Sequence, residues 1–105
     1  MSHYKLCYYV PDSHLDATKQ AVFAAGAGRQ GNYSHCCFQT KGMGQFKPLA
    51  NSQPFIGQQD QVEQVEEWRV EMLCADNVLP QVLAALRQVH PYEEPAIDVW
   101  RLQSP

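Results

Sequence analysis

The segment HPYEEP, residues 90–95, combines a histidine, a tyrosine, two glutamates and two prolines in consecutive positions. Imidazole and carboxylate groups are ligands for divalent cations, and together they can carry out general acid–base chemistry. Each proline also restricts the residue before it, here His90 and Glu94, to extended backbone. The segment therefore predicts either a rigid turn between a helix and a strand or a site built on that turn. In the second case the ligand-binding residues are His90, Tyr92, Glu93 and Glu94.

A second group of candidate residues lies in the glycine-rich segment GAGRQGNYSHCCF, residues 26–38. Phosphate loops of the common kinds run from a strand into a helix, so that the helix N-terminus faces the anion. Here the glycines follow a predicted helix and precede a predicted strand, and Gly26 is interpreted as the C-cap of that helix. The alternative is a backbone nest for an anion, helped by Arg29. On that alternative the ligand-binding residues are Gly28, Arg29, Asn32 and Tyr33.

The same segment contains two further candidate metal ligands, His35 and Cys37. They alternate with Cys36 and Phe38, which we expect to be buried, so His35 and Cys37 share the opposite face of the predicted strand. Imidazole and thiolate can ligate a soft metal, but a packed, hydrogen-bonded histidine is the alternative. The cofactor is unknown, and a divalent metal is the candidate. Its predicted ligands are His90, Glu93, His35 and Cys37.

Hydrophobic periodicity and turn residues predict the elements that position these groups. Strands are predicted at His3–Val10, Tyr33–Thr40, Trp68–Cys74 and Ala96–Leu102. Helices are predicted after an N-cap at Ser13 and after one at Asp76 or Asn77, with Pro80 in the first turn of the second. The order βαββαβ predicts an α+β, ferredoxin-like fold, with one antiparallel sheet and both helices on one face.

The connection between the second and third strands, Lys41–Gln61, is predicted to be a long loop. Loops of this length are uncommon in compact domains and are often functional. After this loop, Val62 and Val65 are out of register with the face that carries Trp68. This mismatch predicts a bulge or bend near Glu66 and Glu67.

The predicted fold leaves one sheet face uncovered, and several of its residues are apolar. An exposed apolar sheet face of this kind predicts a homo-oligomer. The alternative is that scattered surface aromatics need no explanation. The residues expected on this open face are Cys7, Tyr9, Leu73, Trp100 and Leu102.

Composition limits the class of protein. The 105 residues suit a single domain, residues 1–105, and the formal net charge of −3 comes without a basic stripe for nucleic acid. No window is apolar enough to cross a membrane, and the first residues lack the features of a signal peptide. Four unpatterned cysteines fit a reducing compartment. We therefore expect a cytoplasmic protein that binds neither nucleic acid nor membrane.

Three segments of the chain resemble a known family: residues 26–48, 55–72 and 90–100. They are similar to the central inserted domain of the Nif-three-like family, the GTP cyclohydrolase I type 2 homologues or dinuclear metal-centre proteins. HPYEEP also resembles the segment before the last strand of the CutA divalent-ion-tolerance proteins, which are ferredoxin-like trimers related in architecture to the PII signalling proteins. The resemblance implies the same fold, a trimer by analogy with CutA, and a position for Lys41–Gln61 like that of the PII effector loop.

The resemblance also bears on function. In full-length family members the dinuclear metal site belongs to domains that flank the insert, and residues 1–105 contain neither flank. We do not expect the activity of that family here, and no nucleophile with a partnered base indicates another enzyme. The predicted function is a cytosolic homo-oligomeric module of the PII/CutA kind that binds a small ligand or regulates a partner, with sites between subunits. The alternatives are a CutA-like metal-binding protein and a protein-docking module acting through residues 41–61.

Overall fold

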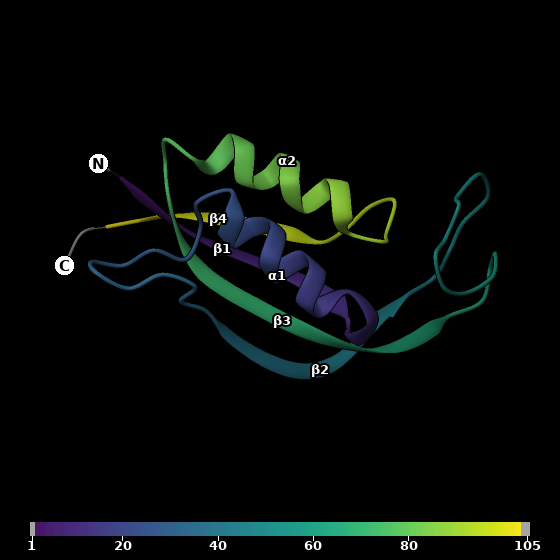
Figure 1. Ribbon diagram of the computed structural model, residues 1–105. Coiled ribbons are helices and arrows are strands. Elements are labelled where there is room, and N and C mark those ends of the chain that lie inside the picture. The colour runs from purple at the N-terminus through teal and green to yellow at the C-terminus, as the bar shows by residue number, and fades with distance from the viewer. Residues whose placement is uncertain (1, 104–105) are drawn as a thin grey trace.

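The computed structural model describes residues 2–103 (Figure 1), which form one four-stranded sheet and two helices. The strands are β1 (His3–Pro11), β2 (Phe38–Phe46), β3 (Glu63–Ala75) and β4 (Ile97–Leu102), and the helices are α1 (Leu15–Ala24) and α2 (Leu79–Val89). The strand order is β2-β3-β1-β4, and every neighbouring pair is antiparallel. Both helices lie on the same face of the sheet (Figure 1), so the ferredoxin-like α+β prediction is confirmed. Within the described residues, no helix is long and apolar enough to span a membrane.

The core lies between the helices and the central strands. Leu6, Tyr8 and Val10 of β1 are fully buried on the helix face, beside alternate residues of β3 from Val70 to Cys74. The Tyr8 hydroxyl donates a hydrogen bond of 3.1 Å to Thr18 Oγ1 of α1, so the polar end of this buried ring is satisfied. Burial raises the pKa of Tyr8 to about 12. On β3, Val70, Met72 and Cys74 are buried and Trp68 packs against the core, so the alternation predicted for Trp68–Cys74 is confirmed.

Gly26 terminates α1 as expected: it follows the last turn of the helix and has a φ of +115°. The Ala27 N–H donates to the Val22 carbonyl at 3.0 Å, and the Gly26 N–H donates to the Phe23 carbonyl at 3.1 Å. These two bonds are those of a Schellman motif, which requires a residue with positive φ and therefore favours glycine.

The predicted N-caps are wrong for both helices. Ser13 lies in a short 3₁₀ turn, Asp12–His14, and its hydroxyl is 2.8 Å from His14 Nδ1. The N-cap position of α2 is Val78, and in the described residues no side chain caps either helix. Backbone turns satisfy the early donors instead, for example Val78 N–H to the Ala75 carbonyl at 3.2 Å. Pro80 does lie in the first turn of α2, as predicted.

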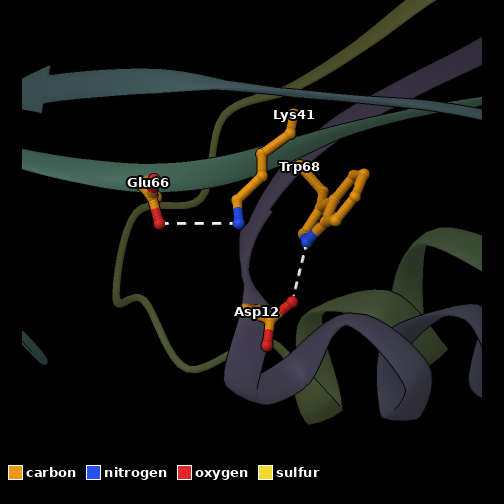
Figure 2. A network of polar contacts seen from close by, with 4 residues as sticks. All are labelled: Asp12, Lys41, Glu66 and Trp68. Atoms are coloured by element: carbon orange, nitrogen blue, oxygen red, sulfur yellow. Dashed lines mark hydrogen bonds and ion pairs between the residues drawn. The ribbon is translucent and has the colours of Figure 1, made fainter.

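Asp12 has a different role, which Figure 2 shows. Its Oδ1 accepts a 2.9 Å hydrogen bond from the indole N–H of Trp68 on β3. Lys41 of β2 lies 5.7 Å from the centre of the Trp68 ring, and its Nζ is 3.5 Å from Glu66 Oε2. These contacts tie the turn before α1 to the β2–β3 hairpin on the helix face of the sheet.

The second strand was predicted at Tyr33–Thr40, and this prediction is wrong at both ends. Strand β2 begins at Phe38 and continues to Phe46, because β3 extends back to Glu63 and pairs with all of it. The preceding residues form no strand of this sheet, and Tyr33 makes an isolated β-bridge with Gln30. The connection after β2 is therefore residues 47–62, shorter than the predicted loop. The expectation that Cys36 and Phe38 are buried is also wrong, because Phe38 is 67% exposed and Cys37 is the residue that packs against the core.

Of the predicted bulge or bend near Glu66 and Glu67, the bulge is wrong. Pairing between β2 and β3 runs without interruption from Phe38↔Glu71 to Phe46↔Glu63. Val65 and Trp68 are out of register because they belong to opposite faces of one regular strand.

The face opposite the helices carries Tyr9, Leu73, Trp100 and Leu102 as predicted, by strand alternation and register. Cys7 is also on this face, but the expectation that it is exposed is wrong, since its exposed fraction is 0%. Its cross-strand partners are Glu71 on β3 and Asp98 on β4. Burial raises the pKa of its thiol.

The backbone at Gly28 generates a testable prediction. Its φ is +77°, and a Cβ there would lie 2.7 Å from the Phe23 ring and 3.0 Å from the Cys36 carbonyl oxygen. Gly28→Ala should lower the free energy of unfolding by about 1–3 kcal/mol from backbone strain alone, measured by urea unfolding. Gly42→Ala is the control, because a Cβ at Gly42 would meet no atom within 4 Å. Equal stabilities of the two variants would contradict the prediction.

Candidate functional site

The topology brings two connections to the same end of the sheet. Strands β1 and β2 end there and strands β3 and β4 begin there, so residues 47–62 and the α2–β4 connection, residues 90–96, lie together (Figure 1). Between these segments and the open face is a cleft of about 290 Å³. This volume is at the small end of the range for ligand pockets. Its lining includes Tyr9, Phe46, Glu67, Tyr92, Glu93 and Glu94.

His90 holds this turn against β1. Its Nε2 is 2.7 Å from the Tyr9 carbonyl oxygen, and its Nδ1 is 3.2 Å from the Tyr92 backbone nitrogen. A carbonyl accepts and an amide donates, so Nε2 carries the proton and the ring is neutral. Only 7% of His90 is exposed. Burial lowers its pKa, against a smaller opposing effect of the hydrogen bond to Tyr9.

Tyr92 links the turn to β3. Its hydroxyl donates a 2.8 Å hydrogen bond to Glu67 Oε2. The pKa of Tyr92 is raised, mainly by burial and to a smaller extent by the Glu67 carboxylate. The Glu67 side chain lies over Gly44 of β2, where a Cβ would overlap the carboxylate. Gly44 therefore makes room for Glu67 at the cleft.

Residues 47–62 are attached to the same turn. The Gln53 N–H donates a 2.8 Å hydrogen bond to Glu93 Oε1. The Phe55 ring lies 6.3 Å from Tyr92 and makes an edge contact with His14 at 5.5 Å. The loop thus forms one wall of the cleft, and a single hydrogen bond and ring contacts connect it to HPYEEP.

The predicted metal ligands do not come together. His35 and Cys37 lie in the α1–β2 connection, at the opposite end of the sheet from residues 90–96 (Figure 1). The His35 ring packs 4.9 Å from Phe23, and its Nδ1 is 2.9 Å from Ser34 Oγ. Among residues 2–103, no three or more His, Cys, Asp or Glu side chains are grouped to hold a metal ion. Both ring nitrogens of His90 are already hydrogen-bonded.

The glycine-rich group lies at that opposite end too. The Gly28 N–H donates to the Leu73 carbonyl, and the Gly28 carbonyl accepts from the Cys36 N–H, both at 2.8 Å. Its backbone therefore serves the packing of this connection against β3. Arg29, Asn32 and Tyr33 are exposed. The two predicted ligand groups thus occupy separate ends of the molecule, and only the one at HPYEEP borders the 290 Å³ cleft.

Three further residues line the cleft and are not among the site residues predicted from the sequence: Tyr9, Phe46 and Glu67. The sequence predicts Tyr9 only on the open face, and Glu67 only as the place of a bulge or bend. Two-residue alternation back from Trp68 places Glu67 on the open face, which could have identified it. Phe46 is not predicted at the site because the predicted second strand ends at Thr40, before it.

The fold defines the chain as a ferredoxin-like domain with the architecture of CutA and PII proteins. CutA from Xylella fastidiosa matches with a TM-score of 0.72 at 14% identity, over 100% of this chain and 88% of that one. GlnK from B. subtilis matches with a TM-score of 0.64 at 14% identity, over 97% of this chain and 86% of that one. At these identities the likeness shows the fold alone.

Sequence similarity defines the relationship more closely. The chain is similar in sequence to part of the proteins named GTP cyclohydrolase 1 type 2 homologues, the Nif3-like family. It is 46% identical over 101 residues to the proteins of Halalkalibacterium halodurans and Mycobacterium tuberculosis. A Bacillus cereus protein related to NIF3 has a TM-score of 0.85 at 37% identity, over 98% of this chain and 26% of that one. The alignment covers 96% of the chain but 27% of each of those two relatives, and no family model matches it.

The neutral state of His90 predicts the pH dependence of stability. Its pKa in the fold is below the ordinary value of 6.5, with Glu67 raising it and His14 lowering it as smaller effects. As the pH falls below about 6.5, the unfolded chain takes up the proton first, so the free energy of unfolding should decrease. Urea unfolding between pH 7.5 and 5 measures this decrease.

His90→Gln retains an amide that can donate to Tyr9 but cannot titrate, so it should flatten this part of the pH profile. The exposed His3 provides the control, and His3→Gln should keep the decrease. An unchanged slope in His90→Gln would show that another group causes it.

Proposed function

We propose that the chain is a homo-oligomeric module of the PII/CutA kind that binds a small ligand in the cleft beside HPYEEP and thereby regulates a partner. The observation that carries the proposal is the cleft itself, a 290 Å³ space lined by rings and carboxylates. Its walls come from the sheet, the turn and the loop, so a bound ligand would contact three parts of the chain. Likeness of fold to CutA and PII proteins supports the general kind of module.

The walls of the cleft differ in how firmly they are held. The turn is fixed to β1 through the buried His90, whereas residues 47–62 reach it through the Gln53–Glu93 hydrogen bond and the contacts of Phe55. Phe55 is 51% exposed, and Leu49 is exposed too. A ligand that displaces the loop would change this exposed surface, which is how the module would signal to a partner protein.

Self-association is supported by the open face. Trp100 is 46% exposed and Phe38 is 67% exposed on that face, although Lys5, Arg69 and Glu71 lie among the apolar residues. Tyr9 belongs both to the open face and to the cleft. A second copy packed on this face would therefore border the ligand site, as in a site between subunits. Four free thiols fit the cytoplasmic location that we propose.

Filling the cleft tests ligand binding. Ala96 lines it and is exposed, so Ala96→Phe should occupy the space without disturbing the core. In the unmodified protein, small single-ring compounds should shift the backbone amide NMR signals of Tyr9, Tyr92 and Gln53. Ala96→Phe should weaken these shifts at least tenfold. The control is Ala84→Phe on the exposed side of α2. Equal shifts in both variants would place binding elsewhere.

A charge on the open face tests self-association. Native mass spectrometry of untagged protein should show an oligomer, and Trp100→Glu should convert it to monomer, because an unpaired carboxylate would be buried between copies. Gln88→Glu adds the same charge to the exposed side of α2 and should leave the oligomer intact. A monomeric unmodified protein would overturn this part of the proposal.

A further inference from the structure

We propose that the ligand of this cleft is a small organic cation, an ammonium group on an apolar body. The inference rests on the proposed function, since it specifies the ligand class of the same site. Charge, hydrogen-bonding capacity and the apolar lining of the cleft lead to it independently.

The charge of the cleft is negative and uncompensated. Glu67, Glu93 and Glu94 line it, and its lining, all within the described residues, contains no Lys or Arg. The ion pairs among residues 2–103 are Lys41–Glu66 and Arg69–Glu71, and neither involves a cleft carboxylate. An anionic ligand would be repelled here, and a cation would be attracted by carboxylates that form no ion pair within the described residues.

Lys41 and Arg69 do line a smaller neighbouring cleft that shares Tyr9 and Glu67 with the first. Each of these cations is already paired with another carboxylate, at 3.5 Å for Lys41–Glu66 and 3.6 Å for Arg69–Glu71. Glu67 lines both clefts and belongs to neither ion pair, so its negative charge is available to a ligand.

The carboxylates are held in position but keep acceptor capacity. Glu67 Oε2 accepts from the Tyr92 hydroxyl, and Glu93 Oε1 accepts from the Gln53 N–H, each at 2.8 Å. Both donors are neutral, so they orient the carboxylates without neutralising them. A carboxylate has about four acceptor sites and an ammonium has three donors. The second oxygens of Glu67 and Glu93 therefore keep acceptor capacity for an ammonium group.

The rest of the lining suits the apolar body of such a ligand. Tyr9, Phe46 and Tyr92 contribute rings, and Phe46 and Tyr92 lie 6.3 Å apart between centroids. Ring faces attract cations as well as apolar groups. The volume of about 290 Å³ suits a ligand with a single ring. A primary amine on one aromatic ring meets all of these conditions.

Three probes of matched shape test the charge requirement: tyramine, a cation; tyrosol, its neutral alcohol analogue; and 4-hydroxyphenylacetate, an anion. Titration followed by backbone amide NMR of the full chain should show that tyramine shifts Tyr9, Tyr92 and Gln53. Tyrosol should bind at least tenfold more weakly, and the anion should cause no shift. Raising the salt concentration from 20 to 300 mM should weaken tyramine binding and leave tyrosol binding unchanged.

The carboxylates are tested by amides of the same shape, which keep the acceptors for Tyr92 and Gln53. The double variant Glu67→Gln with Glu93→Gln should weaken tyramine at least tenfold and leave tyrosol unchanged. Asp16→Asn is the control, because Asp16 is an exposed carboxylate on α1 that lines neither cleft and belongs to neither ion pair. Equal affinity of the double variant and this control for tyramine would overturn the assignment of these carboxylates.

The outcomes separate this inference from the proposed function. If tyrosol shifts the cleft amides as strongly as tyramine does, the cation requirement is wrong and the cleft remains a ligand site. If neither these probes nor the single-ring compounds described above shift the cleft amides, the proposed function is wrong and this inference falls with it.

Discussion

The position of the cleft depends on one buried imidazole. His90 ends α2, donates to the backbone of β1 and accepts from the backbone of Tyr92, so a single neutral ring connects a helix, a strand and a turn. Removing it would leave the partly buried Tyr9 carbonyl without this partner, and an unsatisfied buried acceptor costs about 1–3 kcal/mol. With the turn fixed in this way, Tyr92 reaches Glu67 and Glu93 reaches the backbone of residue 53. The prolines on either side make the same segment stiff.

Strand alternation gives neighbouring residues opposite roles in this molecule. Tyr8 is in the core and bonds to Thr18, whereas Tyr9 lines the cleft. Glu66 pairs with Lys41 on the helix face, whereas Glu67 accepts from Tyr92 on the open face. Each pair of identical residues is divided by the sheet itself, because successive side chains point to opposite faces. The polar contacts drawn in Figure 2 and the candidate site therefore lie on opposite faces of the sheet.

The two possible roles of HPYEEP, turn and site, are compatible in this structure. Its histidine has a structural role, since both ring nitrogens are used by the backbone. Its tyrosine and glutamates face the cleft. Because both ring nitrogens of His90 are already hydrogen-bonded, the geometry does not support a metal site with His90 as a ligand. Because Tyr92, Glu93 and Glu94 line the cleft, it does support a site for an organic ligand. The sequence similarity covers 27% of the length of the Halalkalibacterium halodurans relative, so the contacts described here concern only that part of it.

The sequence alone determined the features that depend on local chemistry. Periodicity predicted the elements and their order, glycine predicted the end of α1, and the prolines predicted the stiff turn before β4. The N-caps and the bounds of β2 were not predictable, because backbone turns and the extension of β3 decide them. The site was half predicted: Tyr92, Glu93 and Glu94 are adjacent in the chain, whereas Tyr9, Phe46 and Glu67 come from three other strands. Only the tertiary structure decided that these six residues meet. Strand register and the buried contacts of His90 determine which connections lie at the same end of the sheet.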